Sequence, residues 1–202
     1  MVAFDTHIQQ ALRALRAGKA IVFPTDTVYG LGVAIEFAQG PEVLYAIKQR
    51  PSTKPIAWLV GSVHDIKRYG KEVPEYALRL AHTFWPGPLT LIVAASKHVP
   101  PAFCSREGTI GLRMPNNEIA LQLIAHIKSP LCTTSANLSG QPSENNFHSL
   151  SLEILQAAGA TLQDGTPKSG VASTVVDCTG IQPVILREGA LSACDLQTCL
   201  QE

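Results

Sequence analysis

The sequence predicts an α/β fold, in which a twisted sheet of mixed parallel and antiparallel strands carries helices on its flanks. The 202 residues match the length of one domain, and we expect a single domain over residues 1–202. Short apolar runs of β type alternate with segments of helical spacing, but several predicted strands follow one another without a helix between them. The hydrophobic fraction of 46% and the aromatic fraction of 6% are typical of a globular protein rich in small aliphatic side chains.

The first half of the chain is predicted to begin with a helix, because its apolar positions recur at helical spacing. Asp5 or Thr6 is expected to cap this helix, and Gly18 to end it. Short apolar runs bounded by turn residues predict strands at residues 20–23, 31–35 and 56–60. Helices are predicted at residues 41–50, where a proline suits the first turn, and at residues 62–69 and 74–85.

The second half of the chain supplies the remaining elements. Strands are predicted at residues 89–95, 109–114, 131–136, 174–178 and 184–187. Helices are predicted at residues 115–127 and 150–158 and in the last residues of the chain. The loop of residues 165–173, GTPKSGVAS, is rich in turn formers, and we interpret it as a flexible lid.

Charge and cysteine content narrow the classes of function. Lysine and arginine total 16, as do aspartate and glutamate, so the formal charge is zero. This balance argues against a protein that mainly coats nucleic acid, although it allows a local basic pocket. The five cysteines form no C-x-x-C pair and are interpreted as reduced, mostly buried thiols. With no signal peptide and no apolar run long enough to span a membrane, a cytoplasmic location is expected.

The segment AIVFPTDTVYGLG, residues 20–32, is the most informative stretch of the chain. A buried strand stops at a proline and is followed at once by hydroxyls and a carboxylate, among them Thr25, Asp26 and Tyr29. Small polar groups beside glycines at the end of a strand are suited to holding a ligand. The alternative is a tight turn in which Asp and Gly serve only as turn formers.

Three cations, Lys48, Arg50 and Lys54, fall within the segment KQRPSTKP. A phosphate would compensate their charges, because arginine binds phosphate bidentately and lysine acts as a point charge. The alternative is a solvated helix end, where basic side chains interact favourably with the helix dipole.

Two further groups of residues are candidate ligand contacts. Ser135 and Asn137 follow an apolar strand in TTSANLSG, where they either meet a ligand or form a turn. Arg113 and Arg187 each interrupt an apolar strand, so each either enters a pocket or is buried in an ion pair; the candidate carboxylates are Asp26, Asp177 and Glu188. Ser173, in the loop before a strand, is a candidate nucleotide contact or a hydroxyl at the start of the strand.

Several common signatures are missing from the sequence. It holds no P-loop and no complete G-x-G-x-x-G, and its six histidines have no metal-ligand spacing. We therefore predict no protein-bound metal and no permanent cofactor.

The segments FPTDTVYGLG, K-x-R, WPGPLT, GLRMP, TSANLSG, STVVD and LREG occur in one order between about residues 11 and 189. In this order they resemble the YrdC-like family of threonylcarbamoyl-adenylate synthases, in a single-domain form with the K-x-R and S-x-N motifs intact. The resemblance implies a twisted α/β sheet with a deep, basic concave face. It also implies a nucleotidyltransferase that converts L-threonine, bicarbonate and ATP, carried with Mg²⁺, into threonylcarbamoyl-AMP and pyrophosphate.

The resemblance also implies residue roles and partners. Lys48 and Arg50 are expected to be catalytic and to bind the ATP phosphates with Ser135 and Asn137. We assign the adenylate end to Ser173 and Arg187, threonine binding to Thr25, Tyr29 and Arg113, and further substrate contacts to Lys54 and Thr133. The product would enter the machinery that forms N6-threonylcarbamoyladenosine at position 37 of tRNA. Two alternatives remain: a protein that binds double-stranded RNA or tRNA, and a YciO-type relative that acts on a related substrate.

Overall fold

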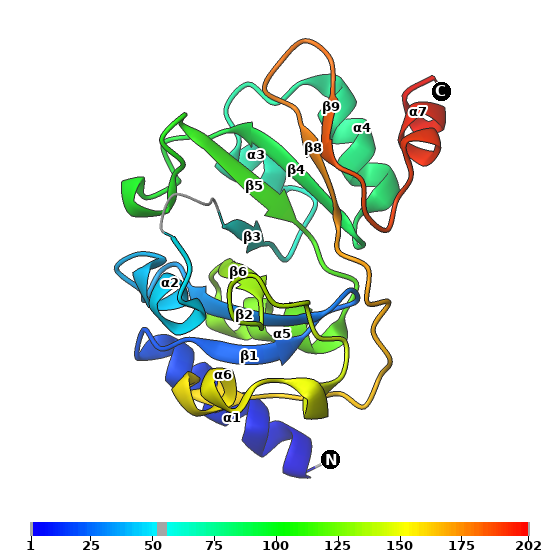
Figure 1. Ribbon diagram of the computed structural model, residues 1–202. Helices are drawn as coiled ribbons and strands as arrows, with labels where there is room; N and C mark the ends of the chain where they lie inside the picture. Colours follow the sequence, from blue (N-terminus) through cyan, green and yellow to red (C-terminus); the bar gives the residue numbers. More distant parts are fainter. Residues whose placement is uncertain (1, 52–55, 202) are drawn as a thin grey trace.

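The computed structural model describes residues 2–51 and 56–201 and is built on a single large sheet. The nine strands of the described residues are β1 (Ile21–Pro24), β2 (Tyr29–Ala34), β3 (Ala57–Leu59), β4 (Leu89–Ala94), β5 (Thr109–Arg113), β6 (Leu131–Ser135), β7 (Ala160–Thr161), β8 (Thr174–Asp177) and β9 (Val184–Arg187). Their order across the sheet is β7-β1-β2-β6-β3-β5-β4-β8-β9. The sheet is twisted: in Figure 1, β1 and β2 run across the view, whereas β8 and β9 run steeply along it.

The sheet mixes both kinds of strand pairing, as predicted. β1–β7, β3–β5 and β4–β8 are parallel, whereas β1–β2, β2–β6, β3–β6, β4–β5 and β8–β9 are antiparallel. The antiparallel pairs β1–β2 and β8–β9 are hairpins, which explains why strands follow one another without an intervening helix. The predicted α/β fold class is confirmed.

Seven α-helices of the described residues flank the sheet (Figure 1): α1 (Val2–Arg16), α2 (Glu42–Lys48), α3 (Asp65–Tyr69), α4 (Glu75–Phe84), α5 (Glu118–Ile127), α6 (Leu152–Ala157) and α7 (Ala193–Gln201). Their apolar faces form two cores. The smaller core joins α1 and α5 to β1 and β6 through side chains such as Leu12, Phe23 and Leu123. The larger core runs along the sheet from β1 to β8 and contains Trp58, which meets Tyr69 and Phe103 edge to face.

Several predicted boundaries differ from the observed ones. Asp5 and Thr6 lie inside α1, which already begins at Val2, so the predicted cap is wrong. Apolar spacing locates the buried face of a helix but does not limit its solvated first turn. Gly18 does follow the helix and has a positive φ of 69°, a conformation that costs glycine little. The two-residue β7 and the short 3-10 helices at Pro101–Phe103 and Phe147–Ser149 were not predicted, because such brief elements have no periodicity to detect.

In the described part of the chain, no helix combines the length and apolar character that crossing a membrane requires. The described cysteines are all unpaired: Cys132, Cys178 and Cys199 are buried, Cys104 is half-buried and Cys194 is exposed.

Candidate functional site

A cavity of about 550 Å³ lies against the sheet and gathers residues from both halves of the chain. This volume lies within the range of small-molecule and cofactor sites. The described residues that line it include eight of the eleven predicted site residues: Thr25, Tyr29, Arg50, Arg113, Thr133, Ser135, Ser173 and Arg187. Lys48 and Asn137 lie behind the cavity wall, and Lys54 lies outside the described residues. The cavity therefore brings most of the predicted site together, while the binding roles of these residues stay predictions.

The turn between β1 and β2 forms one wall of the cavity. Thr25 shapes this turn: its hydroxyl donates to the carbonyl of Val28 at 2.6 Å and accepts the amides of Thr27 and Val28. The segment is a hydrogen-bonded turn, and it also lines the cavity. That it holds a ligand stays a prediction. In this structure the Thr25 hydroxyl proton is directed at the turn.

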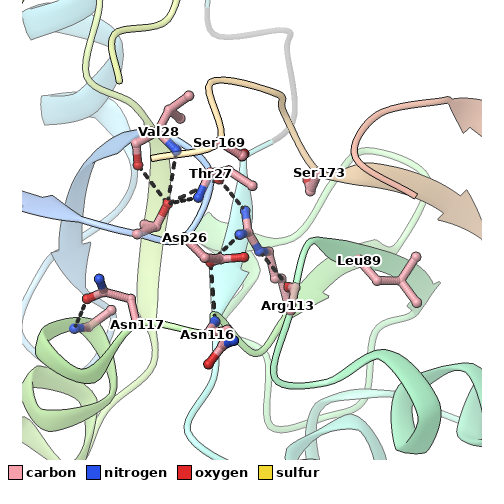
Figure 2. Close-up of polar contacts among 12 residues, drawn as sticks. Asp26, Thr27, Val28, Leu89, Arg113, Asn116, Asn117, Ser169 and Ser173 are labelled. Atoms are coloured by element: carbon pink, nitrogen blue, oxygen red, sulfur yellow. Dashed lines mark hydrogen bonds and ion pairs between the residues drawn. The ribbon is translucent and has the colours of Figure 1, made fainter. Parts of the chain in front are cut away.

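Arg113 ends β5 and is held from three sides (Figure 2). Its Nε donates to Gly87 O at 3.0 Å, its Nη1 to Thr27 Oγ1 at 3.0 Å, and its Nη2 to Asp26 Oδ1 at 2.5 Å. The same carboxylate oxygen accepts the backbone amide of Asn116 at 3.2 Å. Of the candidate carboxylates, Asp26 is therefore the ion-pair partner, and Arg113 faces the cavity as well.

The guanidinium of Arg113 is positioned before any ligand arrives. The residue is 7% exposed, and burial lowers the pKa of Arg113 while the Asp26 carboxylate opposes that shift. Three of its five N–H groups are used in the contacts above, which leaves one N–H on each terminal nitrogen. Two such N–H groups match the two oxygens of a carboxylate.

Lys48, the last residue of α2, is 2% exposed and points into the protein. Its ammonium donates to the carbonyls of Ser135 and Asn137 and, at 3.0 Å, to Asn137 Oδ1. Its own carbonyl accepts the amide of Ser139 at 2.9 Å. Lys48 therefore joins the end of α2 to the segment TSANLSG, and all three of its N–H groups are directed at protein acceptors.

Burial of Lys48 has an electrostatic cost. Desolvation, followed by the charge of Arg50, lowers the pKa of Lys48 from 10.5 to about 8. Arg50 itself lines the cavity and donates to Thr134 Oγ1 at 3.1 Å. In each of the two motifs, K-x-R and S-x-N, one residue lines the cavity and the other lies behind its wall. Arg50 and Ser135 line the cavity, whereas Lys48 and Asn137 lie behind them.

The far wall of the cavity is formed by Ser173 and Arg187. Arg187 donates from Nη2 and Nε to the carbonyl of Ser173, at 2.8 and 3.2 Å. The Ser173 and Thr90 hydroxyls are 2.9 Å apart. Burial lowers the pKa of Arg187, and the charge of Arg187 contributes to lowering that of Arg113. The cavity lining holds four arginines, Arg106 among them, and two glutamates, so an anionic ligand would relieve their mutual repulsion.

Gly30 and Gly32 lie on β2, beside its antiparallel neighbour β6. A Cβ at Gly32 would lie 2.7 Å from Thr133 Oγ1 and 3.0 Å from Cys132 O. A Cβ at Gly30 would lie 3.0 Å from Thr133 Cγ2. These glycines therefore serve the close packing of the strand pair that carries Thr133 into the cavity wall.

Among the lining residues that were not predicted from the sequence are Thr90, Thr134 and Ser143. Thr90 lies inside an apolar strand, Thr134 follows a residue already assigned, and Ser143 stands in a loop rich in polar residues. A single hydroxyl in such settings has no periodicity or neighbouring charge to distinguish it.

Comparisons with known proteins show which proteins this chain resembles. The family model Sua5_yciO_yrdC, described as "Telomere recombination", matches residues 13–189. A threonylcarbamoyl-AMP synthase of Pyrococcus abyssi is 36% identical over 195 residues, which make up 96% of this chain and 57% of that relative. A putative threonylcarbamoyl-AMP synthase of Mycobacterium leprae is 35% identical over 92% of this chain and 84% of its own length.

Solved structures show the same similarity. The crystal structure of P. abyssi Sua5 complexed with L-threonine has a TM-score of 0.87 and 36% identity, covering 95% of this chain and 56% of that one. Escherichia coli YciO has a TM-score of 0.83 and 29% identity, covering 94% and 92%. This chain spans little more than half the length of the P. abyssi relative. Because the family model matches residues 13–189, most of this chain, the chain belongs to the Sua5/YciO/YrdC family.

Proposed function

We propose that this protein is a threonylcarbamoyl-AMP synthase, which forms L-threonylcarbamoyl-AMP and pyrophosphate from L-threonine, bicarbonate and ATP. The observation that carries the proposal is the convergence of Arg50, Arg113 and Arg187 on one cavity lined with hydroxyl groups. Such a site suits a ligand that has a carboxylate at one end and phosphates at the other. The names of the relatives from P. abyssi and M. leprae support the same reaction.

Threonine is assigned to the end of the cavity near Arg113. The two remaining N–H groups of Arg113 would bind its carboxylate, with Tyr29 and Thr133 beside it. Thr25 would support this end through the shape of the turn. The related Sua5 structure in complex with L-threonine supports a threonine site in this fold.

ATP is assigned to the end of the cavity near Arg50. Arg50 and Ser135 would bind the phosphates, and Ser173 and Arg187 the adenylate. Lys48 and Asn137 would support this end from behind the wall. The residues that the structure describes contain no group of three His, Cys, Asp or Glu side chains placed to hold a metal ion. We therefore assign Mg²⁺ to the triphosphate of ATP.

The proposed reaction has two steps. The threonine amine combines with bicarbonate to give a carbamate and water. A carbamate oxygen then attacks the α-phosphorus of ATP, the bond from that phosphorus to the bridging oxygen breaks, and pyrophosphate leaves with the electron pair. Because both the nucleophile and the leaving group are anionic, the arginines contribute by positioning the reactants and stabilising charge.

The product would serve the formation of N6-threonylcarbamoyladenosine in tRNA by a downstream transferase. We propose a cytoplasmic enzyme, in keeping with the unpaired state of the described cysteines.

The test is to incubate the purified protein with ATP, Mg²⁺ and bicarbonate, with and without L-threonine, and to quantify pyrophosphate and AMP-containing products. We expect pyrophosphate release that depends on threonine and falls when serine replaces it. Nucleotide binding without threonine-dependent turnover would refute the proposal and favour a YciO-type activity. RNA binding that ATP displaces would indicate a nucleic-acid ligand in the same cavity.

A further inference from the structure

The segment of residues 164–173, here called the strap, begins with a buried ion pair. The Lys168 ammonium lies 2.6 and 2.7 Å from the two carboxylate oxygens of Asp164. The Lys168 side chain is 1% exposed, although lysine is rarely buried and the strap has no regular secondary structure. Burying a lysine is costly unless it is paired with good geometry, so its position calls for a specific explanation.

The ion pair connects the strap to two neighbouring elements. Asp164 Oδ2 accepts the side-chain amide of Asn117, the N-cap of α5, at 2.8 Å. The Lys168 ammonium lies 5.8 Å from the ring centre of Tyr29, a cavity residue on β2. Burial raises the pKa of Asp164, but hydrogen bonds from Lys168 and Asn117 hold it below its usual value. The carboxylate is therefore well satisfied, and the pair anchors the start of the strap.

Beyond the ion pair, the strap runs along the turn that orients Arg113. The amide of Ser169 donates to Asp26 O at 3.3 Å, and the amide of Gly170 donates to Thr27 O at 2.9 Å. Figure 2 shows Ser169 beside Thr27, on the opposite side of Asp26 and Thr27 from Asn116. The side chains of the same two turn residues accept the hydrogen bonds from the terminal nitrogens of Arg113. The backbone of this turn thus binds the strap while its side chains hold the guanidinium.

The other end of the strap is held separately. Ser173 contacts Thr90 and Arg187, and the next residue donates its amide to Pro88 O at 2.9 Å. Loss of the ion pair should therefore loosen residues 164–170 and leave the Ser173 end in place. Such a change would affect Arg113 more than Arg187.

We propose that Lys168 is a positioning residue: paired with Asp164, it fastens the strap against the turn and thereby fixes Arg113 in the cavity. Lys168 does not line the cavity, so it acts through other residues. The identification of threonine as the ligand of Arg113 rests on the proposed function above. The sequence interpretation of this segment was a flexible lid. On this proposal, the segment is instead held in place and stabilises the turn that orients Arg113.

The experiment compares Lys168→Met with the double variant Lys168→Met/Asp164→Asn, which keeps a side-chain oxygen for Asn117 and leaves no unpaired charge. Lys67→Met is the matched control, because Lys67 is exposed on α3 and is not among the residues that line the cavity. Hydrogen exchange of the Ser169 and Gly170 amides is measured without substrate. Threonine and ATP binding are measured separately by calorimetry.

We expect both Lys168 variants to exchange the Ser169 and Gly170 amides faster and to bind threonine about 10- to 100-fold more weakly. ATP affinity should change less than about twofold, since Ser173 and Arg187 stay in place. Unchanged exchange and threonine affinity would overturn the proposal, as would an equal loss for both substrates. If the wild-type protein does not bind threonine, the proposed function fails, but the exchange rates still decide whether Lys168 fastens the strap.

Discussion

Replacing Lys48 with methionine tests the role of a buried lysine at the phosphate end of the cavity. Methionine has similar length and no polar hydrogen, so the three acceptors of Lys48 lose this donor. The Ser135 carbonyl keeps the amide of Asn137 at 3.0 Å, which leaves two acceptors without a donor, the carbonyl and the side-chain oxygen of Asn137. An unsatisfied buried polar group costs about 1–3 kcal/mol. The substitution also has a stabilising effect, because the variant no longer buries an ammonium group. The lowered pKa of Lys48, about 8, corresponds to a burial cost of about 3 kcal/mol that the variant avoids.

Two unsatisfied acceptors together cost about 4 kcal/mol, so the two effects leave a net destabilisation of about 1 kcal/mol at pH 7. The difference should also depend on pH. In the folded protein the pKa of Lys48 is about 8, against 10.5 as the ordinary value. Between these values the unfolded chain binds more protons, so the stability of the wild type rises relative to Lys48→Met as pH increases, by up to about 3 kcal/mol.

The assay is urea denaturation followed by tryptophan fluorescence at several values between pH 7 and pH 10.5. Lys67→Met is again the control, and its free energy of unfolding should stay within about 0.5 kcal/mol of the wild type. A Lys48→Met variant with unchanged stability at every pH and no activity would refute this reasoning. It would mean that Lys48 acts directly on phosphate, as the K-x-R pattern alone predicts.

Two further substitutions test the geometry of the cavity. Asp26→Asn keeps an acceptor for Arg113 but removes the charge, so we expect threonine affinity, measured by calorimetry, to fall about tenfold with ATP affinity unchanged. Equal affinities for threonine in variant and wild type would show that Asp26 does not position Arg113. Gly32→Ala would force a Cβ against Thr133 and the carbonyl of Cys132, so calorimetric Tm should fall by about 5 °C. An unchanged Tm would mean that β2 and β6 can separate at little cost.

Features that depend on neighbouring residues were predictable from the sequence. The apolar run 20–23 followed by proline predicts the end of β1 and the polar turn after it, and the structure has both. The strand predicted at residues 131–136 is likewise found as β6, which ends at Ser135. Both predictions rest on strand periodicity and turn chemistry, which act over a few residues.

Side-chain partners were less predictable. Sequence reasoning left three carboxylates open for Arg113, and the structure selects Asp26, 87 positions away along the chain. Lys48 has a side chain suited to binding phosphate, yet its ammonium is directed at the carbonyls of Ser135, at the end of β6, and of Asn137, just after it. The lid interpretation failed to anticipate Lys168, because nothing in the residues around it signals burial.

The order and chemistry of the motifs were enough to identify the mixed α/β fold, the family and eight of the residues that line the cavity. The pairing of the strands decides which side chains meet. β6 lies between β2 and β3, and β5 ends with Arg113 beside the turn that follows β1. Local sequence patterns determine which segments form strands and turns, because those preferences arise within a few residues. Which charges are paired, and which are left to meet a ligand, depends on how distant segments pack across the sheet, where burial makes an unpaired charge costly.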